Sequence, residues 1–176
     1  IKIGNIPIIL HIMNYYSKFG VNEFIICAGY KSSVIDKFFK NFTYNKSKLS
    51  FILKNTKLSN LERLSEKWKI NIVNTGVHTM TGGRIKKIAR FIKSENFFMT
   101  YGDGLSNVNL YSLARMHLYK KKIASVTAVK PLSRYGYLKI NNQNNLVSKF
   151  LEKPIREDWI NGGYFLLNKK VFKYIS

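Results

Sequence analysis

The sequence predicts an α/β fold, a Rossmann-like and mostly parallel mixed sheet flanked by helices. Two features of the chain predict it. Short runs rich in β-branched and aromatic residues, such as Glu23 to Ala28 and Phe97 to Thr100, alternate with segments whose apolar residues recur at helical spacing, such as Pro7 to Phe19. Strands that alternate with helices favour parallel pairing. Shorter strands near the C-terminal end predict an appended mixed-sheet region that forms one wall of a cleft.

The helices are predicted from the spacing of their apolar residues. The first has a proline in its first turn and Gly20 just past its end, where a left-handed residue commonly closes a helix. The second places Val34, Phe38 and Phe42 on one face. The predicted ranges are Pro7 to Phe19, Ser33 to Phe42, Arg84 to Lys93 and Leu110 to Lys121.

The strands are predicted from β-prone runs bounded by turn residues, and the runs Glu23 to Ala28 and Ile123 to Val129 are expected to be buried. With 176 residues and 45% hydrophobic composition, the chain can form one sizeable core, so residues 1–176 are predicted to be a single domain. The other predicted strands are Leu49 to Leu53, Lys69 to Val73, Phe97 to Thr100, Gly136 to Ile140, Val147 to Leu151 and Tyr164 to Leu167.

The net charge of the chain is strongly positive, which is typical of proteins that bind a polyanionic partner. The chain carries 30 Lys and Arg against 9 Asp and Glu, a formal net charge of +21. The basic residues are scattered, however, with no run longer than Lys120 to Lys122, whereas nucleic-acid binders concentrate them. Lys, Asn and Ile are abundant together, as AT-rich coding sequences produce. The composition therefore favours neither a nucleic-acid nor a membrane partner.

The cysteine content and the ends of the chain indicate the cellular compartment in which the protein is expected. The single cysteine, Cys27, has no partner for an intrachain disulfide, which favours a reducing compartment. No stretch approaches the roughly 18 apolar residues of a membrane span, and no secretory leader opens the chain. A cytoplasmic protein is expected. Because the chain lacks an initiator Met and stops inside a helical pattern at Ser176, we expect an internal fragment of a longer polypeptide.

The clearest functional signal is Asp103, which stands between Gly102 and Gly104 at the end of an apolar strand. Ligands of α/β sheets bind beyond the carboxyl ends of the strands, and glycines allow a ligand to approach the backbone closely. A carboxylate there suits a phosphate-bound metal. The alternative is a Gly-Asp-Gly turn that carries a solvated Asp.

Three further motifs are suggestive. The segment Thr79 to Arg84 enters a predicted helix, where free N–H groups, two glycines and a guanidinium suit an anion or a nucleobase; the alternative is an N-cap at Thr81 with a flexible glycine pair. Glu152 and Lys153 offer an acceptor for sugar hydroxyls beside a cation for phosphate, or simply a surface ion pair. Asn161 to Gly163 again permits close approach of a ligand.

The order of the motifs is more specific than any one of them. It resembles that of the sugar-1-phosphate nucleotidyltransferases over essentially the whole chain. The segment Met80 to Arg84, following Asn74 to Gly76, is similar to the cytidylyltransferase branch of that family. The matching motifs are Gly4 with Pro7, Cys27 to Lys31, Met80 to Arg84, Tyr101 to Gly104, Arg134 to Gly136, Glu152 to Pro154 and Asn161 to Gly163.

The resemblance implies a role for each matching residue. Asp103 would bind Mg2+, and Asp103 and Lys153 would be the catalytic residues. The residues that would contact the nucleotide are Thr79, Gly82, Gly83, Arg84 and Gly102. The residues that would line the sugar-phosphate site are Gly136, Glu152, Lys153, Asn161 and Gly163.

The implied reaction forms CDP-glucose and pyrophosphate from CTP and glucose 1-phosphate, for the biosynthesis of surface polysaccharide. The sugar phosphate attacks the α-phosphorus in line, with Mg2+ as cofactor, so no protein nucleophile is needed. The full-length enzyme is expected to be a homo-oligomer. The family's Gly-rich triphosphate loop is expected before Ile1 and its second metal-binding Asp after Ser176, so these residues alone are expected to be inactive.

Two alternatives stay open. The same fold could act on another nucleotide or another sugar phosphate, because the base pocket is inferred from one loop. The chain could also be a non-catalytic domain that senses nucleotides or serves a structural role.

Overall fold

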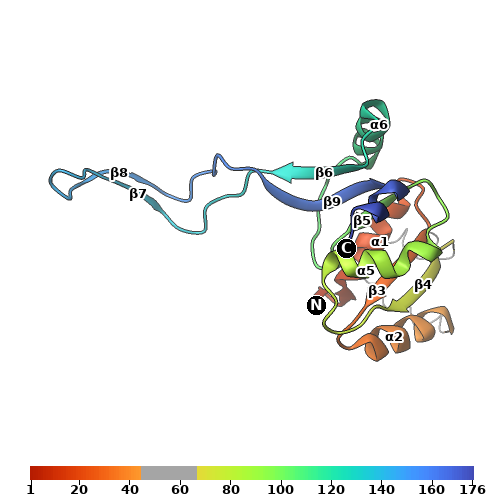
Figure 1. Cartoon of the computed structure of the whole chain (residues 1–176). Coiled ribbons are helices and arrows are strands. Elements are labelled where there is room, and N and C mark those ends of the chain that lie inside the picture. Colours follow the sequence, from red (N-terminus) through yellow and green to blue (C-terminus); the bar gives the residue numbers. More distant parts are fainter. Residues whose placement is uncertain (45–66) are drawn as a thin grey trace.

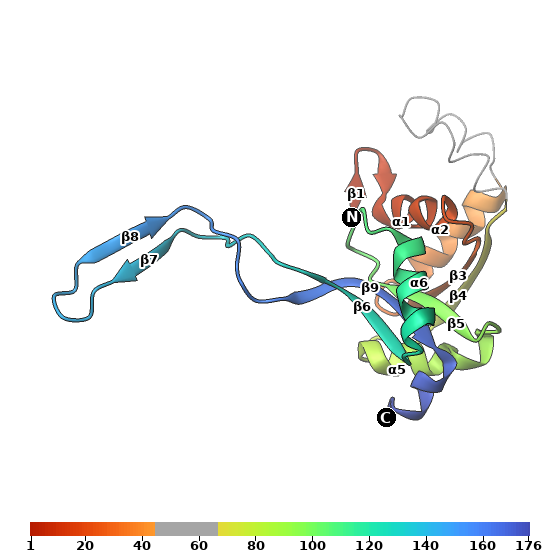
Figure 2. The ribbon, with the colours of Figure 1, turned by 90° about the horizontal axis from the view of Figure 1, so that it is seen from above.

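The chain forms an α/β body from which a long β-hairpin projects (Figures 1 and 2). The computed structural model describes residues 1–44 and 67–176. The body begins with a short hairpin of β1 (Lys2–Ile3) and β2 (Ile6–Pro7), turned at Gly4 with a φ of +60°. The predicted strand Leu49 to Leu53 lies outside the described residues.

The first helix confirms its prediction. Helix α1 (Ile8–Ser17) begins after Pro7, and Gly20 follows it with a φ of +84°. Its apolar side chains divide between two clusters. Leu10 and Met13 pack with Ile6 and Phe39, whereas Ile12 and Tyr16 face the other half of the body. Helix α1 therefore joins the two halves.

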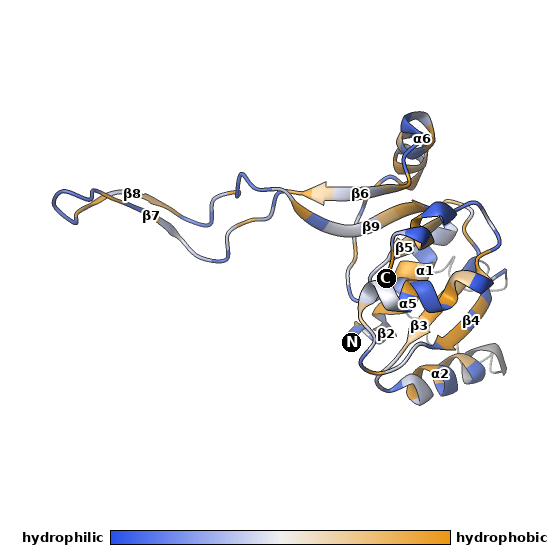
Figure 3. Cartoon of the chain, viewed as in Figure 1, coloured by the Kyte–Doolittle hydropathy of each residue, from blue (hydrophilic) through white to orange (hydrophobic). Residues whose placement is uncertain are grey.

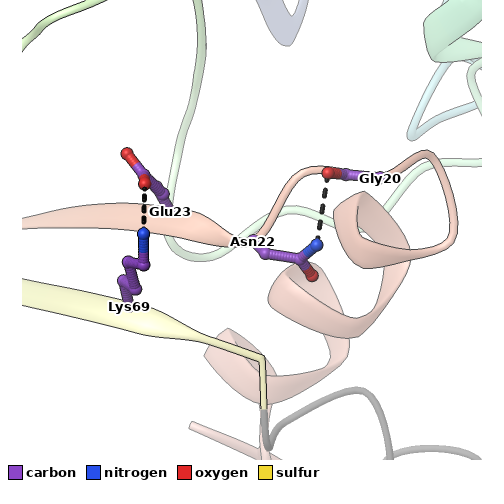
Figure 4. A network of polar contacts seen from close by, with 4 residues as sticks. All are labelled: Gly20, Asn22, Glu23 and Lys69. Atoms are coloured by element: carbon purple, nitrogen blue, oxygen red, sulfur yellow. Dashed lines mark hydrogen bonds and ion pairs between the residues drawn. The ribbon is translucent and has the colours of Figure 1, made fainter.

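Strands β3 (Glu23–Ala28) and β4 (Lys69–Asn74) form a parallel ladder in register from Glu23 opposite Lys69 to Ala28 opposite Asn74. Both strands were predicted. Figure 4 shows Lys69 Nζ donating to Glu23 Oε1 at 3.0 Å across the ladder. This contact lowers the pKa of the exposed Glu23 carboxyl. Because the ladder is parallel, the carboxyl ends of the two strands meet at one edge.

The predicted burial of β3 is wrong for most of its length. Only Ala28 is buried, and the strand begins with an exposed Glu23. Among the described residues β3 pairs on one edge alone, with β4, and this leaves its other edge open. Burial also raises the pKa of the half-buried Cys27 thiol on this strand.

Helix α2 (Ser32–Tyr44) confirms the second predicted helix, but the predicted apolar face is wrong at Val34. Val34 is 60% exposed and Phe39 only 3% exposed. The buried face runs through Ile35, Phe38 and Phe39, one position round the helix from the predicted stripe. The side chain of Phe42 lies outside the described part of the chain.

The second ladder places β9 (Ile160–Asn168) between β5 (Asn96–Thr100) and β6 (Ala124–Val129), antiparallel to both. β5 and β6 therefore run in the same direction. The predicted strands Phe97 to Thr100 and Tyr164 to Leu167 lie inside β5 and β9. The predicted burial of β6 is wrong: only Ser125 is buried, because β6 is an edge strand of this sheet.

Helix α6 (Leu110–Lys120) covers β6 and β9, and it confirms the predicted helix Leu110 to Lys121. Asn109 caps its start by accepting from Ser112 N at 3.0 Å, and Lys121 closes it with a φ of +50°. The core here includes Tyr164, whose ring stacks on Tyr16 of α1 at 5.9 Å between centroids. In Figure 3 the apolar residues gather on β3, β4 and the inner part of β9.

Helix α5 (Thr81–Ile88) starts three residues before the predicted start at Arg84 and ends in the 3₁₀ turn η1 (Ala89–Phe91). A second 3₁₀ turn, η2 (Lys169–Lys173), follows β9. Ile85, Ile88 and Ile92 are buried, as their spacing predicts. No helix within the described ranges is long and apolar enough to cross a membrane.

The projecting hairpin consists of β7 (Tyr137–Ile140) and β8 (Val147–Leu151), both predicted as strands. Every residue of the two strands is exposed, and one bridge, Leu132 to Ile155, joins the connecting segments. The expectation that these strands form one wall of a cleft is wrong for this structure. Both views show the hairpin standing away from the body (Figures 1 and 2).

His117 makes the stability of the body depend on pH. Its Nδ1 lies 2.9 Å from Ser125 Oγ and its Nε2 lies 3.3 Å from Asn96 Oδ1, so α6 is tied to β6 and β5. Burial lowers the pKa of His117 from its ordinary value of 6.5. The unfolded chain therefore binds the proton more readily than the folded chain. The stabilisation is complete above pH 6.5 and is lost as the pH falls through the folded-state pKa.

We expect the free energy of unfolding to decrease as the pH falls from 7 to 5.5, by up to about 1.4 kcal/mol per pH unit. His117→Gln should flatten this slope, and the exposed His78→Gln should keep it. Urea denaturation at several pH values measures both. Equal slopes in His117→Gln and the wild type would contradict the assignment.

Candidate functional site

The predicted nucleotide residues lie where β3 and β4 end. Thr75, directly after β4, is only 1% exposed and donates from its N at 2.8 Å and from its Oγ1 at 2.9 Å to the Ala28 carbonyl that ends β3. The two loops that follow these strands are therefore fastened together at their base. They form one surface facing the start of α5.

Arg84 strengthens this junction. Its Nη1 donates to Ala28 O at 3.2 Å and to Thr75 Oγ1 at 2.7 Å, and its Nη2 donates to Val77 O at 3.2 Å. The guanidinium thus spans both loops. No hydrogen bond from the described residues uses Nε or the second hydrogen of Nη2, so these donors can serve a ligand.

Lys87, one helical turn after Arg84, holds the same loop from its other side. Its Nζ donates to Thr75 O at 2.7 Å and to Thr79 Oγ1 at 3.0 Å. The Thr79 hydroxyl in turn donates to Thr75 O at 2.6 Å. Thr79 is therefore fixed in place by the loop before any ligand binds.

The alternative of an N-cap at Thr81 is wrong. Met80 is the N-cap and makes no side-chain cap hydrogen bond, and residues 81–83 form the first turn of α5. A Cβ on Gly83 would come within 3.0 Å of Thr79 Cγ2, so this glycine allows the loop to pack against the helix. Gly83 thus brings the loop and the helix start together, whereas a Cβ on Gly82 would meet Ile175 Cγ2 at 3.4 Å; neither glycine lies in a loop before the helix.

Gly29 lies within the matching motif Cys27 to Lys31, but no role in the site was predicted for it from the sequence. A Cβ there would lie 2.5 Å from Arg84 Nη1 and 2.9 Å from Gly76 O. Glycine at this position therefore makes room for the guanidinium. Thr75 and Lys87 were not identified as site residues either, although Lys87 lies three residues after Arg84 and hence on the same face of α5.

Asp103 lies beyond the end of β5 in an exposed loop. A Cβ on either Gly102 or Gly104 would meet nothing within 4 Å, so the loop faces open space. Tyr164 OH donates to Gly104 O at 3.2 Å and fastens the loop to the core. Asp103 is thus an exposed carboxylate on a fixed base.

The described residues contain no group of three or more His, Cys, Asp or Glu side chains that could hold a metal ion. Mg2+ commonly uses one or two protein carboxylates and completes its shell with phosphate oxygens and water. The open, exposed carboxylate of Asp103 fits that kind of ligand set. It does not fit a cage made by the protein alone.

Asn161 and Gly163 lie beside the Asp103 loop. Asn161 Nδ2 donates to Tyr101 OH at 3.0 Å, and Gly163 N donates to Asn161 Oδ1 at 2.8 Å. Gly163 has a φ of +79°, and a Cβ there would lie 3.1 Å from the Tyr101 ring. The structure therefore brings these two predicted sugar-phosphate residues against Tyr101, which stands two residues before Asp103.

The other three predicted sugar-phosphate residues flank the hairpin strands. Lys153 Nζ lies 3.4 Å from Glu152 Oε1 in an exposed ion pair, and a Cβ on Gly136 would lie 2.8 Å from Phe150 Cζ. The structure does not bring these residues to Arg84 or Asp103, since the hairpin points away from α5 and β5 (Figure 2).

The whole chain, residues 1–176, matches the family described as nucleotidyl transferase, and it belongs to that family. It is 39% identical over 173 residues to the probable glucose-1-phosphate cytidylyltransferase of Bacillus subtilis, covering 98% of this chain and 67% of the relative. It is 38% identical over 178 residues to the glucose-1-phosphate cytidylyltransferase of Salmonella typhi, covering 100% of this chain and 68% of the relative. The resemblance inferred from the motif order is confirmed.

Solved structures confirm the fold class. A UDP-glucose pyrophosphorylase complexed with UDP-glucose superposes with a TM-score of 0.64 at 16% identity, covering 99% of this chain and 69% of that one. HddC from Yersinia pseudotuberculosis complexed with GMP-PN superposes with a TM-score of 0.61 at 21% identity, covering 98% and 68%. The α/β prediction is therefore correct.

We expect Gly29→Ala to destabilise the protein by about 1–3 kcal/mol, because the new methyl group collides with a guanidinium held by three hydrogen bonds. Gly104→Ala is the matched control, since a Cβ there meets nothing within 4 Å. Urea denaturation measures both. Equal stability of the two variants would show that Arg84 is free to move aside.

Proposed function

We propose that the protein joins CTP and glucose 1-phosphate to form CDP-glucose and pyrophosphate. The observation that carries this proposal is the identity of 38–39% over nearly the whole chain to relatives named glucose-1-phosphate cytidylyltransferase. The identity to the D-glycero-alpha-D-manno-heptose 1-phosphate guanylyltransferase of Campylobacter jejuni is lower, at 29%.

The proposed reaction needs no protein nucleophile. An oxygen of the sugar phosphate forms a bond to the α-phosphorus of CTP, the bond from that phosphorus to the β-phosphate oxygen breaks, and pyrophosphate leaves. The protein must therefore position two phosphates and offset their charge. Mg2+ bound by Asp103 would supply part of that charge neutralisation.

The nucleotide is proposed to bind over the loop held by Arg84. The spare N–H groups of Arg84 offer directional donors for a base edge or a phosphate. The fixed Thr79 hydroxyl, which donates its hydrogen to Thr75 O and accepts from Lys87 Nζ, offers its remaining lone pair as an acceptor. Gly82 and Gly83, in the first turn of α5, are proposed to border the ligand, and Gly102 leaves open space for it on the Asp103 loop.

Glucose 1-phosphate is proposed to bind between Asp103 and the start of β9, against Asn161 and Gly163. Gly136, Glu152 and the catalytic Lys153 contribute only when the hairpin approaches the body. Lys153 would then place a cation against the attacking phosphate.

A panel of substrates tests the proposal. The full-length polypeptide is supplied with Mg2+ and each pairing of CTP, UTP, dTTP or GTP with glucose 1-phosphate or mannose 1-phosphate, and pyrophosphate release is measured. Release dependent on CTP and glucose 1-phosphate supports the proposal. A preference for another pairing supports the same fold with different substrates, and no pyrophosphate release with any pairing supports a non-catalytic domain.

Asp103→Asn should lower turnover on the order of 100-fold or more while leaving stability unchanged, because it removes a metal ligand from an exposed loop. Asp36→Asn, at another exposed carboxylate, is the control and should be as active as the wild type. Turnover at saturating Mg2+ and the urea midpoint are measured for both. Wild-type turnover in Asp103→Asn would refute the metal assignment.

A further inference from the structure

The orientation of the Asn161 amide is fixed by its neighbour. The backbone N–H of Gly163 donates to Asn161 Oδ1 at 2.8 Å, and an N–H group can only meet the oxygen of that amide. The amide nitrogen Nδ2 must then point the other way. It points at the Tyr101 hydroxyl, 3.0 Å away.

This orientation decides the role of the Tyr101 hydroxyl. Because Nδ2 carries only donors, the phenolic oxygen must accept from it, and the phenolic hydrogen is not used in that bond. Within the described ranges no hydrogen bond takes that hydrogen. Tyr101 is 39% exposed, so the residue that carries this free donor is open to solvent at the start of the Asp103 loop.

The ring of Tyr101 is held while its hydroxyl is left free. One face of the ring lies over Gly163, where a Cβ would come within 3.1 Å of Cδ2, and the ring meets Phe165 edge-on at 6.0 Å between centroids. A hydrogen-bonded amide and two packing contacts thus set the position of the oxygen. The free O–H is therefore preorganised beside Asn161, on a residue that stands two positions before Asp103.

We propose that Tyr101 is a substrate-binding residue that donates its phenolic hydrogen to a phosphate oxygen of the sugar phosphate. A charged phosphate oxygen is the strongest acceptor that such a donor meets, and it must lie close to the metal-binding carboxylate for the proposed reaction. This inference rests on the proposed function, which assigns the sugar phosphate to this part of the site.

Tyr101→Phe tests the proposal, because it keeps the ring over Gly163 and removes only the hydroxyl. In the full-length polypeptide we expect the KM for glucose 1-phosphate to rise about tenfold or more and the KM for CTP to stay within about twofold. Tyr119→Phe, an exposed tyrosine on α6, is the control and should change neither constant. Unchanged KM values in Tyr101→Phe, or a rise for CTP alone, would overturn the proposal.

The double variant distinguishes direct donation by Tyr101 to the substrate from an indirect role in which Tyr101 only positions Asn161. If Tyr101 only positions Asn161, adding Tyr101→Phe to Asn161→Ala has no further effect on the KM for glucose 1-phosphate, and the proposed contact is refuted. A further increase supports direct donation to the substrate.

A direct binding measurement tests the contact between Tyr101 and the phosphate independently of which nucleotide the enzyme uses. Isothermal titration with glucose 1-phosphate, and with inorganic phosphate as a second probe, needs no turnover. Weaker binding of both probes in Tyr101→Phe supports the contact with phosphate even if CTP is not the nucleotide. Weaker binding of glucose 1-phosphate alone places the contact on the sugar, and no binding to the wild type rejects the site; both results overturn the proposal.

Discussion

The structure of the candidate site depends on the Ala28 carbonyl, which accepts hydrogen bonds from Thr75 N, Thr75 Oγ1 and Arg84 Nη1. This one oxygen joins the ends of two parallel strands to the helix that follows them. Because Thr75 is buried, each of its polar groups needs such a partner, and losing one would leave a buried group unpaired. Arg84 therefore holds the loops of the site together, in addition to its proposed contact with a ligand.

The sequence predicts elements well where the signal is local. The capping proline and glycine around α1 and the run Glu23 to Ala28 each agree with the structure within about two residues. Burial was predicted less well, because it depends on neighbours distant in the chain. The sequence of β6 is typical of a core strand. In the structure β6 lies at the edge of its sheet, because β9, more than 30 residues later in the chain, pairs between β5 and β6.

The same distinction holds for the site. Glycines next to charged or amide residues identified Asp103, Arg84 and Asn161. Gly29 and Tyr101 also lie in matching motifs, but their roles emerge only from contacts between segments. The expected cleft wall fails for a related reason: Glu152 and Lys153 belong to a hairpin whose strands are exposed on both faces, and no local pattern sets where such a hairpin points. The body thus carries the proposed nucleotide and metal residues, and the hairpin carries part of the proposed sugar-phosphate site.

A double-mutant cycle between Thr75→Val and Arg84→Met tests most directly whether these two side chains hold the loops together. The free energy of unfolding is measured by urea denaturation for the wild type, the two single variants and the double variant. Because Arg84 Nη1 lies 2.7 Å from Thr75 Oγ1, the two changes should be coupled by about 1 kcal/mol or more. Additivity within about 0.3 kcal/mol would contradict this arrangement of the site.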